Sequence, residues 1–153
     1  HVRGERHLAC WSTGRWNVAG CQLRMGHLAR HLMRDFDEVV RTLPVWLEDE
    51  GFYILSDMDL ERMLAEQLGV RSRRYRVFCT CNPRIVERAL EAEPAAGPLL
   101  PCNVAVYQGD QGETVVEMTN PVSLMDLADD HPPDVRDAAE EAHKRLSRVL
   151  ARL

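Results

Sequence analysis

The sequence lacks an apolar run of the roughly 20 residues that a membrane-spanning helix needs, and only 6% of its 153 residues are aromatic. It also lacks a start with basic residues, an apolar segment and a small-residue cleavage site, so we expect neither a secretory signal nor a membrane partner. The five cysteines are odd in number and irregularly spaced, a poor fit to a secreted disulfide framework. We therefore expect a cytoplasmic protein with reduced thiols.

The common catalytic and nucleotide-binding motifs are also missing. There is no G-x-x-x-x-G-K-[ST], no G-x-G-x-x-G after a strand, no G-x-S-x-G and no H-E-x-x-H. These absences argue against P-loop and Rossmann nucleotide sites, serine hydrolases of that type and zinc proteases. No histidine lies near Cys81 or Cys102 in the sequence, so we expect no zinc site.

The charge is unevenly distributed along the chain. Residues 1–26 hold four Arg and one Glu, whereas residues 27–153 hold fifteen Lys plus Arg against twenty-three acids. Binding a polyanion needs a basic face, so we expect no nucleic-acid partner. One short basic cluster is present (Arg71, Arg73, Arg74 and Arg76); it could grip a phosphate, but a solvated loop and strand edge is the simpler interpretation.

Helical periodicity marks two segments in the first half of the chain. After a capping Asp35, apolar residues recur on one face until Gly51, and the internal Pro44 predicts a kink or a break. A second helix is predicted over 57–69, capped by Asp59 and ended by a glycine. Its inward-facing residues are expected to be Met63, Leu64 and Leu68.

Two more helices are predicted in the second half. Asn82 followed by Pro83 is a typical helix start, and the buried side of this helix should carry Ile85, Val86, Ala89 and Leu90. A final helix from Asp134 should place one apolar stripe against the core, formed by Val135, Ala139, Ala142, Leu146, Val149, Leu150 and Leu153.

Strands are predicted over 25–33, 51–56 and 74–81, and on both sides of "QGDQG", where a Gly-containing turn indicates a hairpin. The order is β-α-β-α-β-α-β-β-α, which excludes a purely parallel doubly wound sheet. We expect an α+β fold with a small mixed or antiparallel sheet and helices packed on one face. Residues 25–153 should form one domain, with Met25 as its start and residues 1–24 as an extension.

Two Cys-Asn dipeptides, Cys81-Asn82 and Cys102-Asn103, lie at the edges of apolar runs. The helix that begins after Asn82 could lower the pKa of the Cys81 thiol, giving a site for a thiolate, an anionic ligand or a soft metal. Alternatively, Asn82 only caps its helix and Asn103 only satisfies a strand end. Cys79, two residues before Cys81, should share its face of the strand, which favours two small buried residues.

Three segments resemble the DUF302 family, a domain of unknown function: "FDEVVRTLPVWLEDEGFYILSDMDLERMLAEQLG", "YRVFCTCNP" and "LLPCNVAVYQ". The resemblance runs from about residue 25 to 153 and covers both Cys-Asn dipeptides. It implies a small α+β fold that tends to form homodimers, and it brings no agreed activity. Pro44 departs from the uninterrupted helix that the family leads us to expect.

The leading hypothesis is a homodimeric protein that binds or senses a small ligand or a cofactor. Its site would lie near Cys81, Asn82, Cys102 and Asn103. Haem is one possible cofactor, since axial ligation leaves no spacing signature. A thiol-based redox enzyme using Cys81 and Cys102 is the first alternative, and a protein-interaction module with inert cysteines is the second. The lack of a recognised general base beside the thiols favours binding over catalysis.

Overall fold

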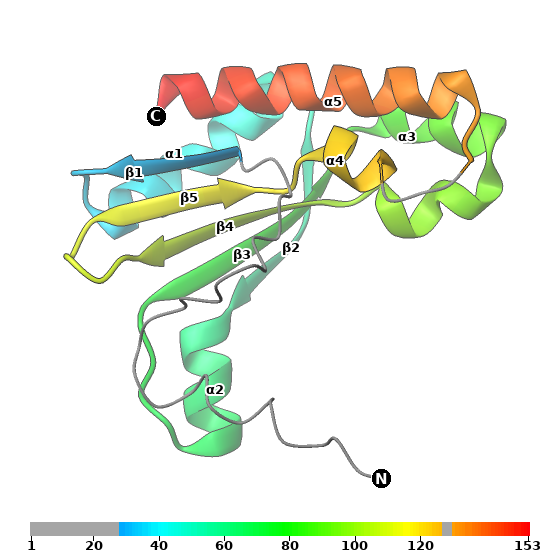
Figure 1. The fold of residues 1–153 in the computed structure, drawn as a ribbon. Helices are drawn as coiled ribbons and strands as arrows, with labels where there is room; N and C mark the ends of the chain where they lie inside the picture. Colours follow the sequence, from blue (N-terminus) through cyan, green and yellow to red (C-terminus); the bar gives the residue numbers. More distant parts are fainter. Residues whose placement is uncertain (1–27, 127–129) are drawn as a thin grey trace, which may run out of the picture.

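The computed structural model describes residues 28–126 and 130–153, so the predictions for residues 1–24 and for Met25 lie outside it. Five strands form one sheet in the order β1-β5-β4-β3-β2, and each neighbouring pair is antiparallel (Figure 1). The strands are β1 (Leu28–Leu32), β2 (Tyr53–Asp59), β3 (Tyr75–Cys81), β4 (Cys102–Gln108) and β5 (Thr114–Met118). The helices are α1 (Phe36–Asp49), α2 (Leu60–Leu68), α3 (Pro83–Ala92), the 3-10 helix η1 (Pro94–Leu99), α4 (Pro121–Met125) and α5 (Pro133–Arg152).

The α+β class and the predicted order of strands and long helices are confirmed. Two short helices, η1 and α4, were not predicted. In the structure Asn120 caps α4, and its side-chain oxygen accepts hydrogen bonds from the N–H groups of Val122 and Ser123.

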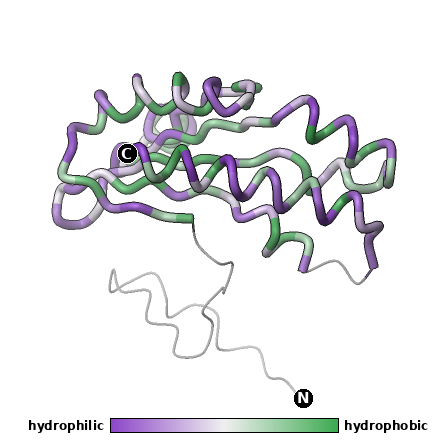
Figure 2. Tube along the Cα trace, turned by 90° about the horizontal axis from the view of Figure 1, so that it is seen from above, coloured by the Kyte–Doolittle hydropathy of each residue, from purple (hydrophilic) through white to green (hydrophobic). Residues whose placement is uncertain are grey.

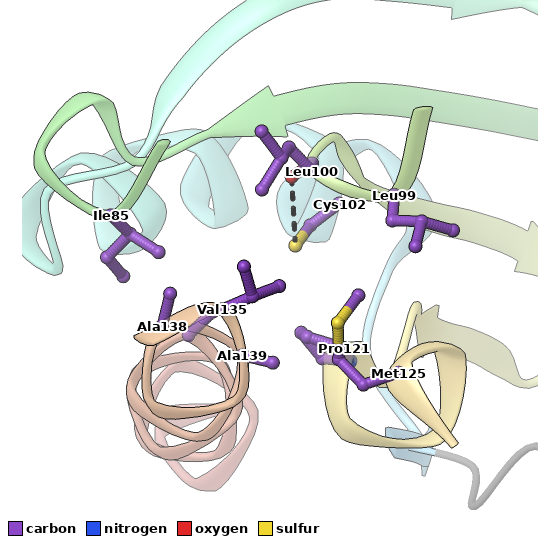
Figure 3. A pocket seen from close by; sticks show the side chains of 10 residues that line it. Ile85, Leu99, Leu100, Cys102, Pro121, Met125, Val135, Ala138 and Ala139 are labelled. Atoms are coloured by element: carbon purple, nitrogen blue, oxygen red, sulfur yellow. Dashed lines mark hydrogen bonds between the residues drawn. The ribbon is translucent and has the colours of Figure 1, made fainter. Parts of the chain in front are cut away.

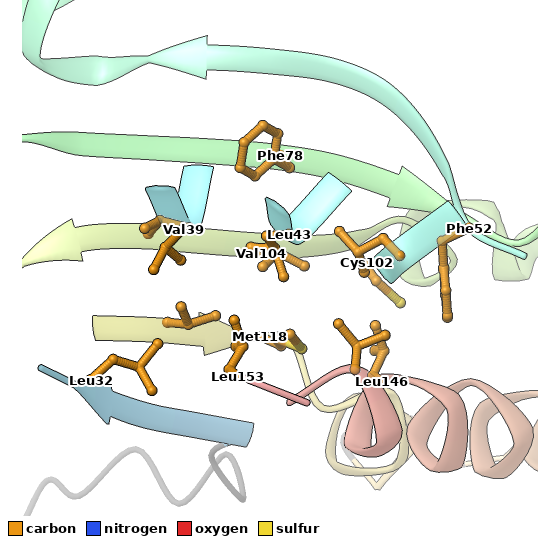
Figure 4. Packing of buried hydrophobic residues seen from close by; sticks show 14 of the residues in the cluster. Leu32, Val39, Leu43, Phe52, Phe78, Cys102, Val104, Met118, Leu146 and Leu153 are labelled. Atoms are coloured by element: carbon orange, nitrogen blue, oxygen red, sulfur yellow. The ribbon is translucent and has the colours of Figure 1, made fainter. Parts of the chain in front are cut away.

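Helices α1 and α5 cover one face of the sheet, and α3 and α4 pack against α5 (Figure 1). Apolar and polar residues are interspersed along the helices (Figure 2). The buried residues of α1 pack against the sheet, whereas those of α3 pack against α5. The main core lies between the sheet and the helices that cover it (Figure 4) and includes Val39, Leu43, Phe52, Phe78, Val104, Val116, Leu146 and Val149. We call the opposite side of the sheet the far face.

Helix α1 runs through Pro44 without the break that the sequence predicted. Asp35 caps its first turn by accepting a hydrogen bond from the N–H of Glu38. At the other end, the N–H groups of Gly51 and Phe52 donate to the carbonyls of Glu48 and Leu47, with N···O distances of 2.8 and 2.9 Å. This is the double hydrogen bond of a Schellman ending, with Gly51 in the left-handed region at φ 84°.

Helix α2 differs most from the sequence prediction. It begins at Leu60 rather than at residue 57, because residues 57–59 extend β2. Asp59 caps it and Gly69 ends it, as predicted. However, none of its residues is buried, and Met63 and Leu68, predicted to face inward, are 45% and 67% exposed.

Candidate functional site

Cys102 points into the helix-covered side of the sheet. It is 4% exposed and lines a cavity between α3, η1, β4, α4 and α5 (Figure 3). Its thiol lies 3.9 Å from the carbonyl oxygen of Leu100, to which it donates. Burial raises the pKa of this thiol to about 12, so it is protonated at neutral pH.

The cavity beside Cys102 is apolar and small. Its walls include Ile85, Leu99, Met125 and Val135, and its volume is about 20 Å³. A single water needs roughly 10–15 Å³, whereas pockets for small organic ligands measure about 300–1,000 Å³. The side chains around Cys102 therefore leave no room for haem in this arrangement.

Cys81 lies on the other side of the sheet. Phe78 and Thr80 on β3 are 2% and 0% exposed and face the core, so the alternation of a strand turns Cys79 and Cys81 to the far face. Burial, followed by the neighbouring Cys79, raises the pKa of the Cys81 thiol. The two Cys-Asn dipeptides thus do not bring their thiols into one site.

Cys79 and Cys81 share a face as predicted, but neither is fully buried. Both are free, and each is only partly covered. The interpretation of the pair as small buried residues is therefore wrong. The reason is that α1 and α5 cover the face of the sheet opposite to these side chains.

Asn82 joins the end of one helix to the start of another. Its side-chain oxygen accepts from the N–H of Ile85 at 3.3 Å and caps α3, while its amide nitrogen donates to the carbonyl of Glu50 at 3.3 Å. A Cβ at Gly51 would lie 2.9 Å from that amide nitrogen, so the turn after α1 requires glycine there. Asn103, in contrast, is exposed, and its backbone pairs with Thr119.

A polar groove of about 480 Å³ lies beside Asn82. Its floor and walls come from the end of α1, the start of β2, the start of α3 and the middle of α5. Arg145 is held there by Glu141 and by the carbonyl of Glu50. Arg84 also lines the groove, and its guanidinium forms no ion pair with the residues that the structure describes.

The predicted basic cluster lies in the loop before β3 and at the start of that strand, and three of its four arginines pair with carboxylates. Arg73 contacts Asp110, Arg74 contacts Asp37 and Arg76 contacts Asp57, with N···O distances of 2.9, 2.5 and 2.6 Å. These pairs fit the interpretation of the cluster as a solvated loop and strand edge.

An apolar surface that the sequence analysis missed lies on β2 and α2. β2 is an edge strand that pairs only with β3 in the described sheet, and large apolar side chains are exposed on it, on α2 and just beyond. We call them the edge patch: Tyr53 (67% exposed), Leu55 (59%), Met58 (40%), Met63 (45%), Leu68 (67%) and Val70 (45%). The helical spacing of apolar residues in α2 was the available signal, but it was interpreted as a side of the helix that faces the core.

The described residues contain no helix long and apolar enough to cross a membrane. Residues 29–153 match the family model described as "Domain of unknown function DUF302". The crystal structure of an uncharacterized conserved DUF302 protein from Bacillus stearothermophilus is similar, with a TM-score of 0.76 and 29% identity over 84% of this chain and 98% of that one. No curated protein matches. The chain belongs to the DUF302 family, as its sequence motifs indicated.

Proposed function

We propose that this domain is a non-catalytic binding module that associates with a second copy of itself through the edge patch. The proposal keeps the homodimer that the family resemblance implied and assigns a surface to it. The observation that carries it is the exposure of six large apolar side chains on two consecutive elements, β2 and α2, and the residues that follow. Large apolar areas exposed on soluble domains commonly mark interaction sites.

The area of the edge patch is sufficient for a modest dimer. Aromatic side chains offer about 150–250 Å² each; at the lower value, which suits the mostly aliphatic residues of the patch, their exposed fractions amount to roughly 500 Å² per copy. Two copies would bury about 1,000 Å², the minimum expected of a specific interface. We therefore expect a dimer of moderate affinity.

Symmetry and charge both favour a second copy as the partner. A two-fold axis beside β2 would place β2 of one copy antiparallel to β2 of the other, the same direction as every described strand pair in this sheet. The acids of β2 would not repel each other strongly, because Arg76 contacts both Asp57 and Asp59.

The thiols support binding rather than catalysis. A thiol reacts as its thiolate, and burial raises the pKa of both Cys81 and Cys102. The separation of these two side chains by the sheet also removes the pair that the redox hypothesis needed.

Hydrodynamic mass measured across a concentration series tests the proposal. The wild type should sediment as a dimer at high concentration. The double variant Met63→Glu/Leu68→Glu should be monomeric, because it would place four buried carboxylates in the interface of two copies. The matched control is Val45→Glu, on α1, where the native side chain is 54% exposed but lies outside the patch. A monomeric wild type, or equal loss in the control, would refute the edge patch as a dimer interface.

A second candidate function is binding of a small polar ligand in the groove beside Asn82. The groove volume of about 480 Å³ lies within the usual range for ligand sites, and Arg84 supplies a charge for an anionic group. Thermal unfolding with inorganic phosphate or citrate tests it. The expected result is a rise in Tm that is lost in Arg84→Ala and kept in Arg71→Ala, an exposed loop control. No rise in Tm with either anion would count against this candidate.

A further inference from the structure

Cys79 and Cys81 form a pair of accessible thiols on one face of one strand. Alternation along β3 places both on the far face, and both are free and partly exposed. In the register of the sheet, Tyr53 lies opposite Cys81, while Ser56 and Asn103 lie opposite Cys79. No charged side chain occupies these opposing positions.

The spacing suits one ion shared between two sulfurs. A strand advances about 3.3 Å per residue, so the two Cα atoms lie about 6.6 Å apart. Metal–sulfur bonds of about 2.3 Å join sulfurs that stand up to about 4.6 Å apart. Two side chains leaning toward each other along the strand can reach this separation without moving the backbone.

A third sulfur lies on the same face of the neighbouring strand. Met58 on β2 is opposite Val77, two positions along from the partner of Cys79. Such diagonal neighbours on an antiparallel pair have Cα atoms roughly 7–8 Å apart, within reach of long side chains. Met58 is 40% exposed, so its thioether is free to turn toward Cys79.

The two thiols and the thioether indicate which kind of ion would bind. Thiolate and thioether ligands favour soft ions, among them copper(I), which accepts two or three ligands. Zinc needs four, and no cluster of three or more His, Cys, Asp or Glu suitable for a metal occurs among the described residues. Asp57 and Asp59 lie opposite Phe78 and Arg76, so their carboxylates are on the other face of the sheet, where Arg76 contacts both.

We propose that Cys79 and Cys81 bind one copper(I) ion on the far face of β3, with Met58 as a third, weaker ligand. Each thiol loses its proton to solvent as its sulfur binds the ion, and no electron is transferred. The two cysteine ligands do not belong to the edge patch, so their pair does not depend on the proposed dimer. Met58 does belong to that patch, and it serves as the third ligand in the monomer.

Anaerobic titration of the full chain with copper(I), in competition with a coloured copper(I) chelator, tests this site. The wild type should bind one ion per chain and develop ultraviolet thiolate-to-copper absorption. Changing a residue that only supports a ligand costs 10–100-fold in metal affinity, so Cys79→Ser and Cys81→Ser should each lose at least about 100-fold. Met58→Leu should lose less than either cysteine variant.

Controls separate this pair from the other thiols of the chain. Cys102→Ala removes a buried thiol from the opposite side of the sheet, and Cys10→Ser/Cys21→Ser removes the remaining two cysteines; both variants should bind copper(I) as the wild type does. The monomeric Met63→Glu/Leu68→Glu variant should also keep the site. Full affinity in Cys79→Ser or Cys81→Ser, or loss of the ion in either thiol control, would overturn the proposal.

Discussion

Helices α2 and α5 have the same kind of sequence pattern and opposite environments. Both carry apolar residues at helical spacing. α5 buries Val135, Ala138, Ala139, Ala142, Leu146 and Val149, whereas α2 buries none of its residues. α5 lies along the helix-covered face of the sheet, whereas α2 stands at the end of β2, away from α5 (Figure 1). Apolar residues at helical spacing therefore indicate that one side of a helix is suited to packing against another surface, but they do not identify that surface.

The two edges of the sheet repeat this contrast. β1 is short, contacts α5 and carries Arg30, whose guanidinium donates to the carbonyls of Leu150 and Ala151. Charged side chains and short strands protect an edge from pairing with another chain. β2 is longer and exposes Tyr53 and Leu55. Its register shifts between Ile54 and Ser56, and its charges, Asp57 and Asp59, lie in the second half of the strand, so its first half is the less protected part of this edge.

The largest expected effect is the difference in stability between two leucine-to-alanine variants, one on α5 and one on α2. Leu146→Ala should lower the free energy of unfolding by about 2–5 kcal/mol, the usual cost of a cavity in a core, because Leu146 is 0% exposed. Leu68→Ala should change the stability of the monomer by no more than about 0.5 kcal/mol. Urea unfolding at low protein concentration measures both. Equal losses would mean that α2 is not the exposed helix described here.

The next largest effect is expected on self-association, when the β2 edge is given a charged side chain like that of β1. Leu55→Lys should weaken self-association by about 100-fold or more, since burying a leucine side chain contributes about 1.5–3 kcal/mol and both copies lose one. Met33→Lys is the matched control, because Met33 follows β1 and is 92% exposed. Light scattering over a dilution series gives both dissociation constants. An unchanged constant for Leu55→Lys would exclude β2 from the interface.

A smaller difference should separate two helix caps. Asn82→Ala removes the cap of α3 and the bond to the Glu50 carbonyl in a buried position, and should cost about 1–2 kcal/mol. Asp59→Ala removes the exposed cap of α2 and should cost about 0.5–1 kcal/mol. Thermal unfolding of the two variants ranks them. A larger loss for Asp59→Ala would reverse the contrast between core and edge.

The smallest effect concerns pH. Hydrogen bonds from Arg74 and Arg148 hold the pKa values of Asp37 and Glu50 below their ordinary values of 3.8 and 4.5. Because the folded-state pKa is the lower one, the stabilisation is present above about pH 4.5 and is lost as pH falls through the folded-state values. Urea unfolding between pH 6 and pH 3 should show this loss. The variant Asp37→Asn should have a smaller slope of the free energy of unfolding against pH. An unchanged slope in that variant would show that Asp37 does not contribute to the pH dependence.

Local signals in the sequence predicted much of the fold. Asp35, Asp59 and Asn82 cap the helices assigned to them, and Gly51 ends α1 as expected. These features depend on short-range hydrogen bonds, which a few neighbouring residues determine. At Pro44 the sequence predicted a kink or a break, and α1 continues through this residue without a break.

The candidate site was harder to predict than the fold. Which face of β3 the helices cover depends on contacts between distant segments, so the exposure of Cys79 and Cys81 was not visible in their spacing. The separation of Cys81 from Cys102 arises in the same way, from the register in which Thr80 rather than Cys81 lies opposite Cys102. The exposure of Met63 and Leu68 depends on what packs against α2, which no periodicity encodes.

Hydrogen–deuterium exchange of the backbone amides of β2 tests the central claim most directly. The wild type at high concentration should protect β2 and α2 more strongly than the Met63→Glu/Leu68→Glu variant does, while β1 and α5 exchange equally in both proteins. Dilution of the wild type should remove the extra protection. Equal exchange of β2 and α2 in the two proteins, or extra protection at β1 instead, would contradict an interface built on the β2 edge.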